Sequence, residues 1–182
     1  MPKKTIIPHR TPMPEQPPLV RAHNYEEVTY GYTAEQAIAE ARRCLECAKP
    51  GCMAGCPVNV DIPAFLERIE EGDFRSAIDI IKKSNALPAI TGRVCPQEVQ
   101  CEATCLLNKK YEPVAIGRLE RFVADWEAIE GLMQNPSPAR LSGKKAAVVG
   151  AGPPFRSIQS NLITMEAMLH CDASHPRVRF RS

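Results

Sequence analysis

Seven of the eight cysteines in this chain of 182 residues lie in two short groups, and their spacing restricts the possible fold more than any other feature. The first group has the pattern C-x2-C-x4-C-x3-C-P, and the second has the pattern C-P-x4-C-x3-C. Grouped cysteines with proline directly after one of them are typical ligands of iron–sulfur clusters. The pattern therefore predicts a protein that carries electrons. The seven residues are Cys44, Cys47, Cys52, Cys56, Cys95, Cys101 and Cys105.

The other common uses of grouped cysteines fit this sequence less well. A disulfide framework is typical of small secreted domains, whereas this chain begins MPKKT with no apolar signal segment after it. A structural zinc site usually pairs two C-x2-C motifs, and only Cys44 and Cys47 have that spacing here. We therefore expect iron–sulfur clusters in a cytoplasmic protein, with a zinc-binding scaffold as the alternative.

Charge and composition argue against several classes of partner. The formal net charge of +2 is too small to indicate a nucleic-acid or membrane surface. No stretch approaches the roughly 18 consecutive apolar residues of a membrane-spanning helix. Aromatic residues make up only 5% of the chain, so we expect bound clusters to contribute part of the folding free energy. These features leave open whether the protein forms an oligomer.

Local signals predict helices. Residues 1–30 contain six prolines and no helical periodicity, so we expect an extended arm that lies on a partner or domain. Thr33 and Gln36 form a capping box. Asp61 and Asp73 are suited to the starts of two further helices, and Gly131 is suited to the end of the last helix. The expected helices span residues 34–46, 62–71, 74–83, 101–105 and 117–130, with residues 87–90 as a connector.

These signals divide the chain into four expected parts. The arm at 1–30 precedes a helical domain at 31–131, which binds two 4Fe–4S clusters. A linker follows at 132–144, and an incomplete Rossmann-like start with an atypical tail occupies 145–182. The expected fold class is all-α for the cluster-binding part.

The last part begins like a dinucleotide-binding site and then departs from that pattern. Residues 145–149 are typical of a buried strand, and they lead into Gly150 and Gly152. The third glycine of the fingerprint is replaced by Phe155, and the 30 residues after Gly152 are too few for a flavin domain. Gly150 and Gly152 are thus a weak candidate cofactor site. We expect a tail that is foreign to the domain, through truncation or a shifted reading frame.

The cysteine count raises the question of how the ligands divide. Two cubane clusters need eight ligands, and the groups supply seven cysteines. In two-cluster ferredoxins the cysteine before proline serves the other cluster. By this rule Cys44, Cys47 and Cys52 share one cluster with a cysteine of the second group, and Cys56 joins the rest of that group. An acidic oxygen ligand would complete the second set, although spacing does not identify it.

Several segments resemble the N-terminal iron–sulfur domain of the glutamate synthase small-subunit family. The same domain occurs in dihydropyrimidine dehydrogenase and in the large subunit of electron-bifurcating ferredoxin–NADP transhydrogenases. The resemblance covers roughly residues 13–152 and includes all seven cysteine spacings. Its segments are MPEQ at 13–16, GYTAEQA at 31–37, CPV at 56–58, DIP at 61–63, GDF at 72–74, GRVCP at 92–96 and IGRLER at 116–121.

The resemblance implies a ligand set and a function. One cluster would take Cys44, Cys47, Cys52 and Cys105, and the other would take Cys56, Cys95, Cys101 and Glu120. The family relays electrons between a flavin-bearing domain or redox partner and a second redox site. FAD and NADPH belong to its full-length members, so we do not expect this chain to bind them, and no catalytic residue is assigned. The alternative is a non-catalytic fragment or interaction module that binds clusters.

Overall fold

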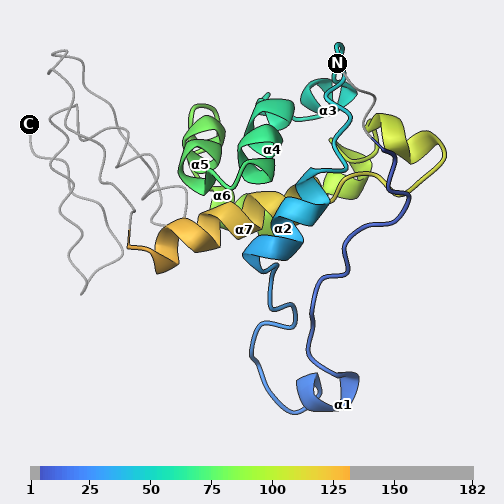
Figure 1. Cartoon of the computed structure of the whole chain (residues 1–182). Coiled ribbons are helices and arrows are strands. Elements are labelled where there is room, and N and C mark those ends of the chain that lie inside the picture. Colours follow the sequence, from blue (N-terminus) through green and yellow to red (C-terminus); the bar gives the residue numbers. More distant parts are fainter. Residues whose placement is uncertain (1–4, 132–182) are drawn as a thin grey trace, which may run out of the picture. The chain divides into compact units, whose positions relative to one another are not determined.

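Helices dominate residues 5–131, which are the residues described by the computed structural model (Figure 1). This part contains no β-strand, and its one isolated bridge joins Glu15 to Thr29. The expected all-α class is therefore confirmed there, while the expected linker, strand and Gly150–Gly152 motif lie outside the described residues. The helices are α1 (Pro18–Arg21), α2 (Ala34–Ala41), α3 (Gly51–Ala54), α4 (Ile62–Glu70), α5 (Phe74–Lys82), α6 (Pro88–Val94) and α7 (Ile116–Ile129), with 3-10 turns at Gln97–Val99 and Leu106–Lys109.

The expected capping residues start their helices as predicted. The Thr33 side chain accepts the backbone N–H of Gln36, and the Gln36 side chain accepts the N–H of Thr33, which completes the capping box of α2. Asp61 and Asp73 accept backbone N–H groups at the starts of α4 and α5. These short-range contacts depend only on neighbouring residues, which explains why the sequence reveals them.

Three of the predicted boundaries are wrong. Helix α2 ends at Ala41 rather than near Glu46, because the N–H groups of Arg43 and Cys44 bond to carbonyls three residues back and Glu46 has a positive φ of 48°. Residues 87–90 are not a connector, since α6 starts at Pro88. Cys101 and Cys105 are not carried by a helix, because turns occupy residues 100–104 and the 3-10 segment starts after Cys105.

The hydrophobic core lies where α4, α5 and α7 meet. Helix α5 contacts both α4 and α7, and helix α2 also packs against both of them. Phe74 stands edge-on to Phe122, with ring centroids 4.9 Å apart, and it packs against the core while partly buried. None of the helices within residues 5–131 is both long and apolar enough to cross a membrane. The fully buried apolar side chains include Phe65, Leu66, Ile69, Ile78, Ile81, Leu119 and Val123.

The N-terminal arm lies against the helical domain at two points, and Figure 1 shows its α1 end extending away from α3. Near its start, Arg43 donates to the carbonyl oxygens of Ile7 and Pro8 at 3.1 and 3.2 Å. Near its end, Arg121 donates to the carbonyl oxygen of Thr29 at 2.8 Å. Part of the expected extended arm is thus bound to the chain's own helices, with the short helix α1 between the two points.

Candidate metal centre

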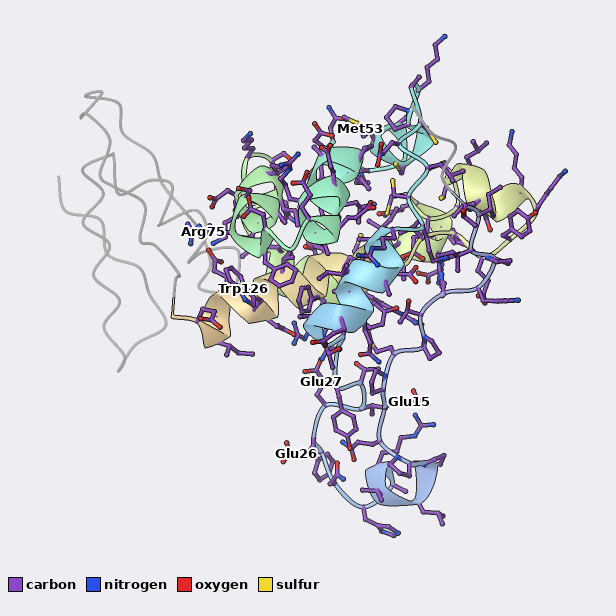
Figure 2. All side chains as sticks on the ribbon, in the orientation of Figure 1. Glu15, Glu26, Glu27, Met53, Arg75 and Trp126 are labelled. Carbon is purple, nitrogen blue, oxygen red and sulfur yellow. The ribbon has the colours of Figure 1, made fainter. Side chains whose placement is uncertain are left out.

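Four cysteines from both sequence groups surround one pocket. Cys44 and Cys47 lie on the loop after α2, Cys52 lies on α3, and Cys105 comes from the second group. The empty space among these side chains is about 400 Å³ when the open solvent at the mouth of the pocket is included. In Figure 2 most sulfur atoms lie on the Met53 side of the molecule, away from Trp126. The apolar part of the lining consists of Leu45, Pro50, Ile62, Pro63, Leu66, Leu106, Leu107, Val114 and Ile116.

In this pocket, burial and the neighbouring thiols both raise the pKa of a cysteine. Burial raises the pKa of Cys52 to about 11, and the charges of Cys44 and Cys105 add to the effect. A thiol must lose its proton to bind iron, so metal binding here is coupled to proton release. The pocket offers four sulfur donors within an apolar wall, and this donor set fits a 4Fe–4S cluster.

The other three cysteines of the two groups lie near one another and near acidic residues. Burial raises the pKa of Cys101 to about 12, with further contributions from Glu102, Cys56 and Cys95. Burial also raises the pKa of Cys95, followed by the charges of Glu120, Cys56 and Glu98. The three thiols thus interact with one another, and the Glu120 carboxylate interacts with Cys95. This set also fits a 4Fe–4S cluster, with one oxygen in place of a sulfur.

The loops that carry the two cysteine groups interlock at two glycines. The Thr104 hydroxyl donates to the carbonyl oxygen of Gly51 at 2.9 Å, across from one group to the other. A Cβ atom on Gly51 would lie 2.6 Å from the Thr104 carbonyl oxygen, and one on Gly55 would lie 2.8 Å from the Gln100 carbonyl oxygen. Only glycine permits such a close approach of two backbones. This contact brings Cys105 beside the first group.

Glu120 projects from α7 toward the neighbouring helix α6. Its Oε1 atom accepts hydrogen bonds from Asn85 Nδ2 at 2.8 Å and from the Thr91 hydroxyl. Burial raises the pKa of Glu120, and the hydrogen bonds from Thr91 and Asn85 oppose that rise. The side chain is thus fixed and partly buried, unlike a glutamate on the solvent face of a helix.

Some of these residues were not expected from the sequence. Thr104, Asn85 and Thr91 have no motif spacing relative to the cysteines, and their partners are distant in the chain. Cys171 and the Gly150–Gly152 motif lie outside the described residues. Among the residues that are described, no three His, Cys, Asp or Glu side chains converge closely enough to hold a single metal ion.

Comparison with known proteins identifies the family. Residues 21–132 match the family described as dihydropyrimidine dehydrogenase domain II, 4Fe-4S cluster. This match covers more than half of the chain, so the chain belongs to that family of 4Fe–4S domains.

Similar proteins include subunits of larger oxidoreductases. The chain is 38% identical over 144 residues to the glutamate synthase [NADPH] small chain of Escherichia coli (strain K12), which covers 79% of this chain and 30% of that protein. It is 39% identical over 131 residues to the NAD-dependent dihydropyrimidine dehydrogenase subunit PreT of Salmonella typhimurium, covering 71% and 32%. The chain therefore spans about a third of the length of these relatives. The resemblance to the glutamate synthase small-subunit family is confirmed.

Proposed function

We propose that this chain is an electron-relay domain that holds two 4Fe–4S clusters and passes single electrons between a flavin-bearing domain or partner and a second redox site. One observation carries the proposal: the two cysteine groups meet in space. Four thiols from both groups surround one pocket, and the other three thiols, also from both groups, interact with one another, with Glu120 acting on Cys95. Membership of the 4Fe–4S family supports the assignment of iron–sulfur clusters to these donors.

The proposed ligands divide across the two groups. Cys44, Cys47, Cys52 and Cys105 hold the first cluster, and Cys56, Cys95, Cys101 and Glu120 hold the second. A bound 4Fe–4S cluster supplies one-electron oxidation and reduction. The protein contributes the thiolate and carboxylate ligands and an apolar wall that limits the access of water. Hydrogen bonds and burial around the ligands then set the reduction potential.

The relatives suggest the direction of electron flow. Their names include NADPH and NAD, and the reduced nicotinamide of such cofactors delivers two electrons as a hydride. A flavin can accept that pair and release its electrons one at a time, which is the form that an iron–sulfur relay accepts. For this chain we place the flavin and the nicotinamide on a partner or on another domain. The partner would determine which molecule finally accepts the electrons.

The cluster content provides the first test. We expect protein purified without oxygen to be brown and to contain about eight irons and eight acid-labile sulfides per chain. Dithionite should bleach the colour reversibly and produce EPR signals of reduced 4Fe–4S clusters. Colourless protein that binds zinc but takes up no iron on reconstitution would contradict the proposal in favour of a zinc scaffold.

Two cysteine variants test the division of ligands. Cys101→Ala and Cys105→Ala remove thiols only four positions apart, yet we expect each to remove a different cluster. The two variants should therefore leave different residual EPR spectra, and Cys52→Ala should resemble Cys105→Ala. Identical residual spectra for Cys101→Ala and Cys105→Ala would show that each sequence group binds its own cluster. Glu120→Ala should change the iron content or potential of the second cluster alone.

An electron-transfer assay separates a relay from a non-catalytic module. NADPH alone should leave the clusters of this chain oxidised, whereas NADPH with a flavin-bearing partner should reduce them. The corresponding flavin-containing part of a glutamate synthase small chain is the first partner to use. Clusters that dithionite reduces but that accept no electrons from any such partner would favour the non-catalytic alternative.

A further inference from the structure

The two carboxylate oxygens of Glu120 have different surroundings. Oε1 accepts two hydrogen bonds, from Asn85 Nδ2 at 2.8 Å and from the Thr91 hydroxyl. Within residues 5–131 the structure records no hydrogen bond to Oε2 and no ion pair to either oxygen. One oxygen is thus held by neutral donors, and the other is available for a ligand.

The two donors are themselves fixed in position. Asn85 is buried, its Oδ1 accepts the backbone N–H of Leu87 at 3.0 Å, and its Nδ2 also lies 2.7 Å from the Thr91 hydroxyl oxygen. Gln97 Nε2 donates to the Thr91 carbonyl oxygen at 3.0 Å. These contacts join the start of α6 to the loop that follows Cys95. The donors therefore form a rigid frame around one oxygen of Glu120.

The approach of α6 to α7 depends on Gly92. A Cβ atom at this position would lie 2.7 Å from the backbone nitrogen of Arg121 and 2.8 Å from its Cα. The missing side chain lets the backbone of α6 lie directly against α7 beside Glu120. Thr91, the residue before Gly92, is thereby placed within hydrogen-bond reach of the carboxylate.

The turn that leads into α6 explains only part of this arrangement. Asn85 supports the start of the helix through Oδ1, which accepts from Leu87. That role does not require its amide Nδ2 to point at a partly buried carboxylate. Glu120 is partly buried, and burial of a carboxylate without a cationic partner is unfavourable. A positively charged metal at Oε2 would supply the missing compensation.

We propose that Asn85 and Thr91 are positioning residues, which hold Glu120 through Oε1 so that Oε2 is presented to the second cluster. This inference rests on the proposed function, in which Glu120 is the oxygen ligand. Hydrogen bonds to the back of a metal ligand fix its orientation, and their loss commonly weakens metal binding about 10-fold to 100-fold. The corner iron at Glu120 is therefore the part of the cluster that these residues control.

The test uses substitutions at two positions, which leave Glu120 in place. Thr91→Val removes the hydroxyl at nearly constant volume, and Thr91→Ser restores it. Asn85→Asp retains the Oδ1 acceptor for the Leu87 N–H but removes the amide donor. Asn24→Asp is the matched control, because Asn24 Oδ1 accepts the N–H of Glu26 at 2.9 Å in the same two-residue arrangement on the arm.

The readout is the release of one iron from the second cluster under mild oxidation. EPR detects the resulting three-iron form, and the cluster at Cys44, Cys47, Cys52 and Cys105 serves as the internal reference. We expect about 10-fold faster release in Thr91→Val and Asn85→Asp, based on the usual effect of losing such hydrogen bonds. Thr91→Ser and Asn24→Asp should match the unsubstituted protein.

The outcomes separate this inference from the proposed function. Unsubstituted protein that binds no second cluster would overturn both. A second cluster that forms and then releases iron at the same rate in Thr91→Val and Asn85→Asp would overturn the inference alone. Equal acceleration at both clusters would also overturn it, because general loosening of the fold would then account for the effect.

Discussion

Glu40 and Arg43 form a buried ion pair one residue before the first cysteine of the chain. Arg43 donates to the Glu40 carboxylate at 2.7 Å, and both side chains are almost completely excluded from solvent. The same carboxylate accepts the backbone N–H groups of Thr11 at 2.6 Å and Ala115 at 2.9 Å. This pair therefore joins α2 to the arm and to the segment before α7, and it anchors the loop that starts at Cys44.

Breaking this pair should destabilise the protein strongly. Glu40→Ala leaves the Arg43 charge buried without its partner, and we expect a loss of about 3–5 kcal/mol in the free energy of unfolding. Urea unfolding of the cluster-loaded protein, followed by circular dichroism without oxygen, measures the loss. Arg68→Ala is the control, because its ion pair with Glu71 is exposed and should contribute little. Similar losses in the two variants would contradict the expected role of the buried pair.

Tyr32 should make the stability of the protein depend on alkaline pH. Its hydroxyl donates to the Thr11 carbonyl oxygen at 2.6 Å, and burial raises its pKa above the usual 10.0. The neutral phenol is favoured in the folded state, so its contribution is complete below about pH 10 and is lost as the pH rises through the folded pKa. Tyr32→Phe should lower the free energy of unfolding by about 1 kcal/mol at pH 8. Above pH 10, the free energy of unfolding should fall less with rising pH in Tyr32→Phe than in the unsubstituted protein.

Unfolding of the two proteins at a series of pH values measures this difference. Tyr25→Phe is the control at pH 8, because the Tyr25 ring is fully exposed and its substitution should leave stability unchanged. A constant difference between Tyr32→Phe and the parent from pH 8 to pH 11 would rule out the proposed ionisation.

The contact between α6 and α7 should tolerate no side chain at Gly92. Because the added Cβ of Gly92→Ala would meet the backbone of Arg121, the two helices must separate. We expect a loss of about 1–3 kcal/mol, which is typical of overpacking. Thermal or urea unfolding measures it, and Ala89→Ser on the exposed side of α6 should change stability by about 0.5 kcal/mol or less. A stability of Gly92→Ala equal to that of Ala89→Ser would show that the contact is adaptable.

Removal of the clusters should loosen the cysteine loops before it loosens the helical core. Metal binding contributes to folding where the ligands lie, whereas α4, α5 and α7 are joined by buried apolar side chains such as Phe65 and Ile81. Hydrogen exchange should therefore show lost protection at residues 44–57 and 95–105 and retained protection in the three helices. Reconstitution with iron and sulfide should restore the loops. Uniform loss across the chain would mean that the clusters support the entire fold.

The parts of this fold that can be predicted from the sequence depend on contacts between residues close together in the chain. Thr33, Asp61 and Asp73 bond to N–H groups three residues away, so their roles can be recognised without a structure. Helix α6 escaped detection because Thr91 and Gly92 have low helix propensity. Both residues are needed for contacts with α7, and these contacts stabilise a helix that the local sequence disfavours.

The identities and spacing of the cysteines alone indicate iron–sulfur chemistry, because thiolate ligands of this kind are recognisable without coordinates. The resemblance implied that Cys105 joins Cys44 and Cys52, but the physical cause of this proximity is visible only in the tertiary structure, where two backbones cross at Gly51 and Thr104. The orientation of Glu120 likewise depends on residues 29 and 35 positions away in the chain. Sequence specifies which donors exist, whereas long-range packing decides which of them lie together.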